Sequence, residues 1–135
     1  MAHYFSINKK AEGVYREYYQ NGTLYKLCYC TNGKFNGEYK EYHKNKQLFL
    51  SCNYINDKIE GISIKYHMNG KIWEILNYKN NRIDGEYRKY HQNGNLKILC
   101  NYKNGKLEGE NIVYKHNNKI KNIYIYKNNE KIDAL

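Results

Sequence analysis

Glycine recurs at a fixed interval along this chain of 135 residues. Such self-similarity indicates a repeat protein, in which each unit contacts only its neighbours. The glycines follow one another every 24 residues, at Gly13, Gly37, Gly61, Gly85 and Gly109. A tyrosine comes five residues after each of them, at Tyr18, Tyr42, Tyr66, Tyr90 and Tyr114. We therefore expect a single repeat domain over 1–135, made of a half repeat (3–12) and five units, numbered here unit 1 to unit 5: 13–36, 37–60, 61–84, 85–108 and 109–133.

Two turn signals in each unit predict its local structure. The first follows the repeat tyrosine, as at Asn21-Gly22, Asn69-Gly70 and Asn93-Gly94. The second closes the unit, as at Asn32-Gly33 and Asn104-Gly105. Because Asn-Gly pairs suit the positive φ of two-residue turns, the aromatic and aliphatic segments between them are typical of antiparallel strands. Each unit is therefore predicted to be one hairpin.

Alternation within the strands indicates one preferred face. In Leu48, Leu50, Cys52 and Tyr54 every second residue is apolar. The first strand changes parity between the residue two positions after the glycine and the tyrosine five positions after it. A β-bulge there would place both rings on one face. We also expect the repeat glycine to let a ring from a neighbouring strand lie against bare backbone.

The fold class that follows is all-β. Hairpins in tandem give an elongated, twisted, single-layer antiparallel sheet of about 11 or 12 strands. The aliphatic content is low, but 17 tyrosines supply rings that strands accommodate well. No apolar run reaches the ~18 residues that a membrane span needs, and the N-terminus lacks the apolar core of a signal peptide. We therefore expect an intracellular, cytoplasmic protein that is not secreted.

At this point the residues carry a family resemblance. The segments YKNGKLEGE (102–110) and YHQNG (90–94) resemble MORN repeats (membrane occupation and recognition nexus). They are most similar to the longer-spaced variant found in bacterial proteins described as antitoxin components and in proteins of giant DNA viruses, whose host cytoplasm would then be the location. The resemblance implies a scaffold, a dimerisation module or a surface that binds lipid or protein.

Three histidines share one register, which invites a functional interpretation. They are His43, His67 and His91, in consecutive units. Neighbouring members should lie about 10 Å apart, and no repeated cysteine or carboxylate completes a metal site. We expect a ladder of half-exposed rings and no metal. In the functional alternative, protonation of the row near pH 6 would strengthen binding to an anionic surface.

The four cysteines suggest structural thiols. Cys28, Cys52 and Cys100 stand fifteen residues after a repeat glycine, where other units hold Leu76 and Tyr124. Cys30 completes a Cys-x-Cys pair on one strand, but no second pair at zinc-site spacing follows. The thiols are therefore expected to pack as small hydrophobes in a reducing compartment.

Aromatic and basic residues provide the remaining functional hypothesis. Tyr25, Phe49 and Trp73 share one register, and 23 Lys and Arg against 13 Asp and Glu give a net charge of +10. The rings could grip a partner or pack within their own sheet, and the lysines could attract anions or only keep the sheet soluble. Phosphate loops and nucleophile elbows are missing from the sequence, so no enzyme activity and no cofactor are expected.

The sequence thus predicts a non-enzymatic scaffold that binds an unidentified protein or itself, with strand edges favouring an end-to-end homodimer. One alternative is peripheral binding to anionic membrane lipid through the basic, aromatic-rich face. Another is antitoxin-like neutralisation of a partner protein. Nucleic acid is a less favoured partner.

Overall fold

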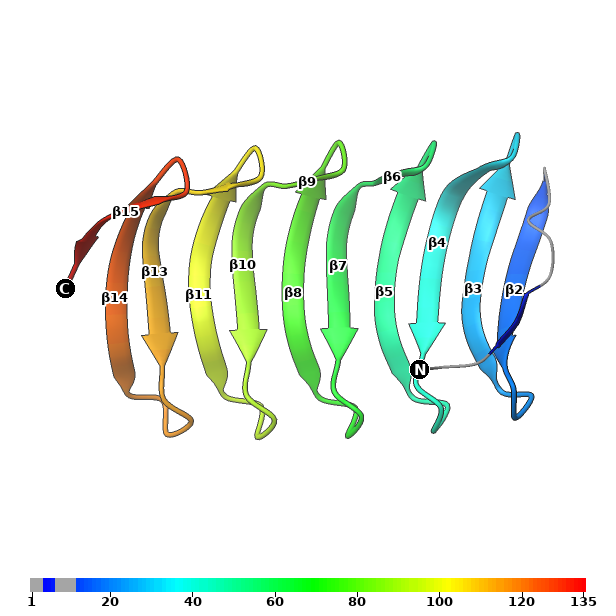
Figure 1. Cartoon of the computed structure of the whole chain (residues 1–135), viewed down its shortest axis with the longest axis horizontal. Helices are drawn as coiled ribbons and strands as arrows, with labels where there is room; N and C mark the ends of the chain where they lie inside the picture. Colours follow the sequence, from blue (N-terminus) through cyan, green and yellow to red (C-terminus); the bar gives the residue numbers. More distant parts are fainter. Residues whose placement is uncertain (1–3, 7–11) are drawn as a thin grey trace.

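The computed structural model describes residues 4–6 and 12–135 as one antiparallel sheet (Figure 1). Twelve strands form its continuous path, in the order β1-β2-β3-β4-β5-β7-β8-β10-β11-β13-β14-β15, and three short strands extend it at one rim. The predicted all-β, single-layer fold is confirmed. The strand bounds are β1 (Tyr4–Ser6), β2 (Gly13–Tyr19), β3 (Leu24–Thr31), β4 (Lys34–Tyr42), β5 (Leu48–Ile55), β6 (Lys58–Ile59), β7 (Gly61–Tyr66), β8 (Ile72–Lys79), β9 (Arg82–Ile83), β10 (Gly85–Tyr90), β11 (Leu96–Lys103), β12 (Lys106–Leu107), β13 (Gly109–Tyr114), β14 (Ile120–Lys127) and β15 (Glu130–Ala134).

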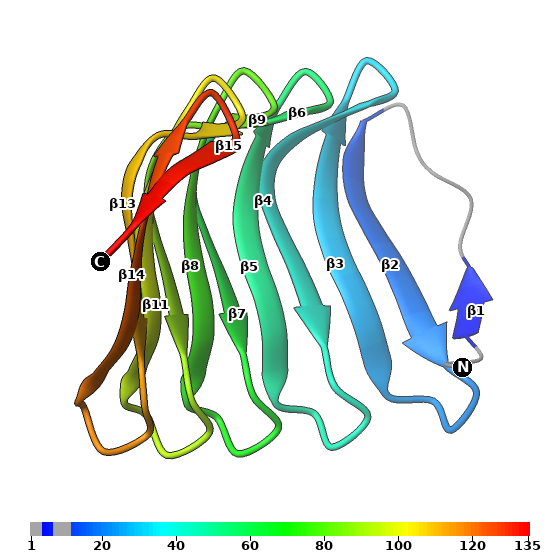
Figure 2. The same cartoon turned by 60° about the vertical axis from the view of Figure 1, so that its left-hand side comes forward.

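The turns lie in two rows along opposite rims of the sheet (Figure 1). We call the row at the bottom of Figure 1 the lower turn row; it comprises 20–23, 44–47, 68–71, 92–95 and 116–119. The row at the top, the upper turn row, comprises 32–33, 56–57, 80–81, 104–105 and 128–129. Figure 2 shows that the strands between the two rows are curved and that the sheet twists along its length.

At the N-terminal end, β1 pairs with β2 through Tyr4↔Tyr19 and Ser6↔Glu17. This agrees with a first edge strand formed by the half repeat. The remainder of that half repeat, apart from Glu12, lies outside the described residues.

A β-bulge is present in every unit, as predicted, but it lies in the second strand. In unit 3 the pairs Lys65↔Glu74 and Tyr66↔Ile72 leave Trp73 as the extra residue. The first strand therefore alternates without interruption up to its tyrosine. The two rings of the first strand, such as Tyr39 and Tyr42, consequently lie on opposite faces, and the prediction of one common face was wrong.

The two faces of the sheet can now be named by register. The packed face carries the residues 2, 4, 13, 15 and 17 positions after the repeat glycine. The open face carries those 1, 3, 5, 11, 14, 16 and 18 positions after it. All ten buried side chains of the described chain are on the packed-face side: Tyr15, Glu17, Tyr19, Cys28, Cys30, Tyr39, Cys52, Ser63, Leu76 and Cys100. The hydrophobic core is thus one side of a single layer.

The repeat glycines are required by backbone conformation. Their φ angles lie between 83° and 114°, which side-chain-bearing residues rarely adopt. A Cβ at Gly61 would meet nothing within 4 Å, and one at Gly85 would meet only Asn77. The prediction that a neighbouring ring lies against bare backbone is therefore wrong for these glycines. Only at Gly37 does an aromatic side chain, Tyr29, approach the Cβ position.

Hydrogen bonds between neighbouring units hold both rims. In the upper turn row, the carboxylate before a repeat glycine accepts from a turn backbone N–H 20 residues later; examples are Glu60 with Asn80 (2.8 Å) and Glu108 with Asn128 (2.9 Å). In the lower turn row, Asn69 Nδ2 donates to the carbonyl of Gln92 (3.2 Å) in the next unit. The recurrent Glu-Gly and Asp-Gly carboxylates therefore join units to each other.

Candidate binding surfaces

A row of aromatic rings follows the lower end of the packed face. Each bulge places its extra residue on the same face as the residue that follows it in the strand. Tyr25, Phe49 and Trp73 therefore turn towards the rings of the preceding strand. The ring centroids of His43 and Phe49 are 4.9 Å apart, and those of His67 and Trp73 are 5.6 Å apart and stacked. Phe49 and Trp73 are 6.3 Å apart. We call these half-buried side chains the ring row: Tyr25, Phe49, Trp73, His43 and His67.

Lysines surround the rings of this row. The Nζ atoms of Lys65 and Lys89 lie 6.0 and 5.8 Å from the Trp73 ring centroid. Lys26 Nζ is 5.4 Å from the centroid of Tyr25. Cations near the face of an aromatic ring gain modest electrostatic attraction and remain available to an anion from outside. The row thus combines apolar ring surface with positive charge.

Each of the three histidines contacts a backbone carbonyl oxygen of the next unit. Nε2 of His43 lies 3.0 Å from the carbonyl oxygen of Tyr66, and His67 and His91 repeat the contact with Tyr90 (3.4 Å) and Tyr114 (3.1 Å). A carbonyl only accepts, so Nε2 donates and carries the proton. In unit 1 the Tyr19 hydroxyl makes the same bond to Tyr42 (2.5 Å). The histidines therefore join consecutive units, and within the described residues no group of three His, Cys, Asp or Glu is arranged to hold a metal ion.

Three carboxylates inside the packed face were missed by sequence reasoning. Glu17 is only 4% exposed and accepts from the Tyr15 hydroxyl. The Tyr39 hydroxyl donates to Glu41 (2.6 Å), and the Tyr87 hydroxyl donates to Glu74 (2.7 Å). The signal in the sequence was a tyrosine two residues before Glu17 and Glu41, on the same face of the same strand. Glu74 had no such local signal, because its partner Tyr87 lies on another strand.

These contacts change the acidity of the tyrosines. Burial, and then the hydrogen bond to Glu41, raises the pKa of Tyr39 far above its ordinary value. The pKa of Tyr87 rises in the same way through burial and Glu74. Lys65 Nζ lies 3.4 Å from the second oxygen of Glu74, and Lys26 Nζ lies 3.7 Å from Glu17. These two lysines thus partly neutralise the carboxylates of the packed face.

The cysteines are free thiols that pack in the sheet. All four are buried, and Cys28 is the most completely enclosed. Burial raises the pKa of Cys52 and of Cys100 to about 11, with the charge of Glu41 adding to the effect at Cys52. Few thiolates therefore form at Cys52 and Cys100 near neutral pH. The prediction that three of these thiols take the place of small hydrophobes agrees with their burial.

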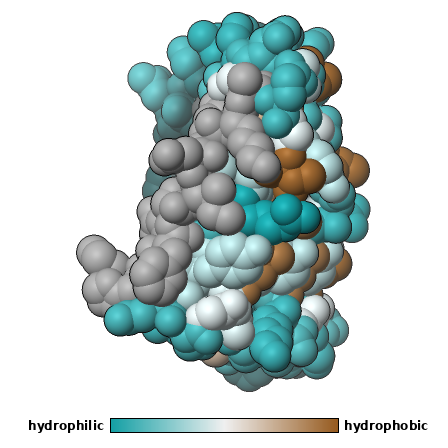
Figure 3. Space-filling view, turned by 90° about the vertical axis from the view of Figure 1, so that its right-hand side faces the viewer, coloured by the Kyte–Doolittle hydropathy of each residue, from teal (hydrophilic) through white to brown (hydrophobic). Residues whose placement is uncertain are grey.

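The lower turn row is purely basic. Its five segments, all within the described ranges, contain no Asp or Glu but include the exposed side chains Lys44, Lys46, Lys71 and Lys119. Upper-row turns lie beside carboxylates such as Glu60 and Asp84. Figure 3 shows hydrophilic side chains at both rims, with hydrophobic ones between them. An anionic partner would therefore meet the least repulsion at the lower rim.

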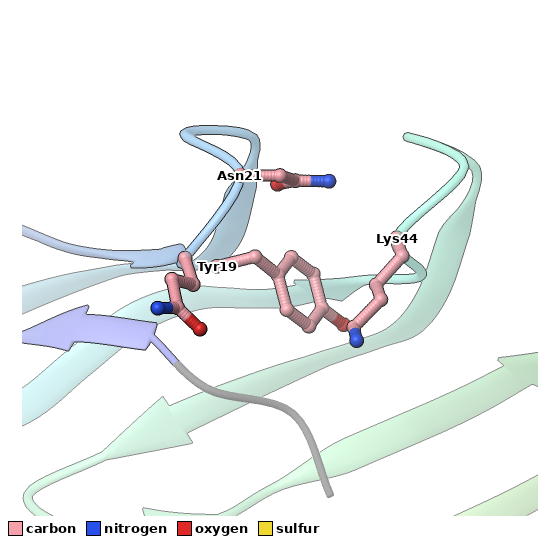
Figure 4. A pocket seen from close by; sticks show the side chains of 4 residues that line it. Tyr19, Asn21 and Lys44 are labelled. Carbon is pink, nitrogen blue, oxygen red and sulfur yellow. The ribbon is translucent and has the colours of Figure 1, made fainter.

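The lower rim also contains a shallow recess at its N-terminal end. It has a volume of about 350 Å³ and is lined by Tyr19, Gln20, Asn21 and Lys44. The Tyr19 ring points from β2 towards Lys44, whose Nζ is 5.9 Å from the ring centroid (Figure 4). Burial, and then the charge of Glu41, raises the pKa of Tyr19, so its hydroxyl stays neutral. The recess offers a lysine and two amides to a polar group.

The open face presents the repeat tyrosines, five positions after each repeat glycine. In each unit the tyrosine lies opposite a leucine or isoleucine, as in Tyr66↔Ile72 and Tyr90↔Leu96. All five tyrosines are half-exposed. The repeat tyrosines thus form part of the sheet surface in every unit.

The model of the MORN repeat variant family matches residues 11–30, 35–56, 59–80 and 83–104. No curated protein matches the chain. Among solved structures, the chain is similar to a crystal structure of TarM, with 17% identity and a TM-score of 0.39 over 93% of this chain and 21% of that one. It is also similar to a crystal structure of a GtfA/B complex bound to UDP and GlcNAc, with 14% identity and a TM-score of 0.36 over 90% of this chain and 24% of that one.

Proposed function

Because the chain belongs to the MORN repeat variant family, whose repeats indicate an interaction or scaffold role, we propose that it is a non-enzymatic binding scaffold for an acidic segment of another protein. The binding surface is the ring row together with the lower turn row. The observation that carries the proposal is the position of half-exposed aromatic rings beside a row of turns that has lysines and no acids.

The arrangement supports binding through both apolar and charged contacts. Rings such as Trp73 offer large contact area, and a lone tryptophan often contributes much of an interface's energy. Lys65 and Lys89, on the two strands that flank Trp73, and Lys71 in the adjoining turn would meet the carboxylates of an acidic segment. The packed-face acids are already held by tyrosine hydroxyls, which favours a scaffold over acid-base chemistry.

The single tryptophan provides the test. Titration with a polyglutamate peptide should change Trp73 fluorescence saturably, and added salt should weaken the binding because exposed charges are screened. The double substitution Lys44→Glu, Lys46→Glu should weaken it by about tenfold. The matched control is Lys79→Glu, Lys103→Glu, which makes the same change in net charge away from the lower rim. Equal loss in both variants, or no saturable signal, would contradict the proposal.

A second candidate, peripheral binding to anionic lipid, is favoured by one residue. Met68 is 62% exposed and stands in the lower turn row of unit 3, among the lysines. An apolar tip between basic side chains suits the interface of an anionic bilayer. Vesicles containing phosphatidylserine should then carry the protein upward in flotation, and Met68→Ser should reduce the floating fraction. A protein that stays at the bottom at low salt would remove this candidate.

None of the described residues belongs to a helix that is long and apolar enough to cross a membrane.

A further inference from the structure

A line of basic side chains crosses the open face beside the upper turn row. Lys79 and Lys103 stand 18 positions after a repeat glycine, and each lies directly opposite another base, Arg82 and Lys106 respectively. Lys58 precedes them in β6, and both β6 and β9 lie at this rim (Figure 1). Because neighbouring strands are about 4.8 Å apart, the line is continuous over roughly 20 Å. We call it the basic ladder: Lys58, Lys79, Arg82, Lys103 and Lys106.

The two like-charged pairs of the ladder are exceptions in this sheet. Every other directly opposed pair of charged residues among the described strands joins an acid and a base, as Lys65↔Glu74 does. Like charges that lie directly opposite one another destabilise a sheet. The ladder pairs therefore cost stability, and an anion bound between them would remove that cost.

The charges of the ladder are not used inside the protein. All five side chains are exposed, and none makes a hydrogen bond or an ion pair with another described residue. The carboxylates of this rim are held elsewhere. Glu60 accepts from the turn N–H of Asn80 (2.8 Å), and Asp84 accepts from that of Asn104 (3.1 Å). The ladder is therefore available to a ligand.

Two shallow recesses of about 410 and 340 Å³ lie along the ladder and share Arg82 and Asn104. The first is lined by Lys58, Lys79, Asn80, Arg82 and Asn104. The second is lined by Arg82, Lys103, Asn104, Lys106, Glu108 and Asn128. Glu108 is the only acid in these two linings, and it accepts from the turn N–H of Asn128 (2.9 Å). Each recess thus offers several cations and side-chain amides to an anion.

The spacing of the cations favours a linear ligand with closely spaced charges. A single phosphate would engage only part of a line that runs through units 2 to 4. An extended acidic peptide turns alternate side chains away, so it presents a carboxylate only about every 7 Å, against a cation about every 4.8 Å in the ladder. Inorganic polyphosphate links successive phosphates through one oxygen, and lysine and arginine both bind phosphate oxygens strongly.

The neighbouring side chains disfavour nucleic acid. Proteins that bind single strands stack the bases on aromatic rings. The ladder contains no ring, and the adjacent open-face register, 16 positions after the glycine, holds Asn53, Asn77 and Asn101 in the same three units. The contacts on offer are therefore contacts to phosphate alone.

We propose that the basic ladder binds inorganic polyphosphate, which lies along the open face at the upper rim from unit 2 to unit 4. The lower turn row is a poorer match, because its turns in units 1 and 4 carry no lysine and its charges are not continuous. The site goes beyond the proposed function, since it uses the other face and the opposite rim from the ring row and the lower turn row.

The first experiment is isothermal titration calorimetry of the full chain with polyphosphate at about 0.15 M salt, which screens isolated surface charges. Lys79→Gln, Lys103→Gln removes one cation from each opposed pair and should weaken binding by about tenfold. The matched control, Lys44→Gln, Lys119→Gln, makes the same change in net charge in the lower turn row and should stay within about twofold. The charge-preserving variant Lys79→Arg, Lys103→Arg should also stay within about twofold. Equal loss in the first two variants would overturn the proposal in favour of a general attraction to net charge.

Thermal unfolding provides a second measurement. Polyphosphate should raise the unfolding midpoint of the native chain more than that of Lys79→Gln, Lys103→Gln, because a ligand stabilises the folded state that binds it. Without polyphosphate this variant should unfold at no lower temperature than the native chain, since it relieves both like-charged pairs. A variant that is markedly less stable without ligand would show that the ladder serves the fold, and would overturn the proposal.

The choice of ligand is tested in the same titration with single-stranded DNA, polyglutamate and vesicles containing phosphatidylserine. Binding as tight as that of polyphosphate, with the same loss in Lys79→Gln, Lys103→Gln, would overturn the proposal and assign the ladder to nucleic acid, peptide or lipid. The Trp73 fluorescence response to polyglutamate should be retained in this variant, so that failure of the ladder and failure of the proposed function are distinguishable.

Discussion

The packed face and the open face of this sheet contain the same number of strands but use their residues differently. Buried residues lie on the packed-face side, and the register fifteen positions after the glycine holds Cys, Leu or Tyr in different units. The open face has no buried residue among those described, yet its tyrosine register is the same in all five units. In this molecule the most strictly repeated side chains are therefore not the most buried ones.

The difference has a physical explanation. In a single layer, each packed-face side chain meets neighbours from adjacent strands, so residues of different size can compensate one another locally. The open face has no covering layer, and its regularity gives a continuous surface instead of a filled interior. A side chain that is repeated without change thus indicates a continuous surface here. Which residues are buried follows from their register position and not from how strictly they repeat.

The largest expected effect compares one leucine with one isoleucine in β8. Leu76→Ala removes a buried packed-face side chain and should lower the free energy of unfolding by about 2–4 kcal/mol. Ile72→Ala removes a half-exposed open-face side chain and should cost about 1 kcal/mol in the monomer. Urea unfolding at low protein concentration measures both. Equal losses would break the distinction between the faces.

The next effect concerns the glycine that begins the first strand of unit 3. Gly61→Val forces a β-branched residue to φ near 83° and should cost about 1–3 kcal/mol, seen as a lower midpoint of thermal unfolding. The control is Gly105→Asn, because Asn81 and Asn129 adopt φ of 67° and 71° at the same register. That variant should stay within about 0.5 kcal/mol of the native protein. An unaltered midpoint in Gly61→Val would show that the strand can begin without a left-handed residue.

The smallest effect compares two tyrosines of β4. Tyr39→Phe removes the hydroxyl that donates to Glu41 and leaves a carboxylate in the packed face with one partner fewer, at a cost of about 1–2 kcal/mol. Tyr42→Phe, on the open face, should change stability by less than about 0.5 kcal/mol. Chemical denaturation at neutral pH separates them. A larger loss in Tyr42→Phe would reverse the comparison.

Much of the fold was predictable from the sequence, because the glycine period and the Asn-Gly turns define units, hairpins and strand order locally. The bulge was predictable from the parity change, but its strand was not. An extra residue in either strand restores the pairing, and only the observed register showed that it is Trp73 and its equivalents. For that reason the two rings of the first strand, where both are present, were assigned to one face.

The candidate surfaces were predictable only in part. His43, His67 and His91 were correctly grouped, but their acceptors are carbonyls 23 residues further along, which no local pattern identifies. Glu41 was missed although Tyr39, whose hydroxyl donates to it, stands only two residues earlier in β4, because the bulge expected in that strand left the faces of its residues unassigned. Tyr25, Phe49 and Trp73 follow from the period alone, and their function as a binding surface stays a prediction.

The hydrogen bonds of the two rims also limit how such a chain can change in length. Each spans 20 to 23 residues and joins a residue of one unit to a residue of the following unit. Insertion of a whole 24-residue unit would offer the same donors and acceptors again, whereas insertion of a single residue within a unit would misalign both rims and exchange the faces of the residues beyond it. Lengthening by duplication is therefore structurally conservative in this sheet, and each added unit would extend the ring row and the lower turn row together.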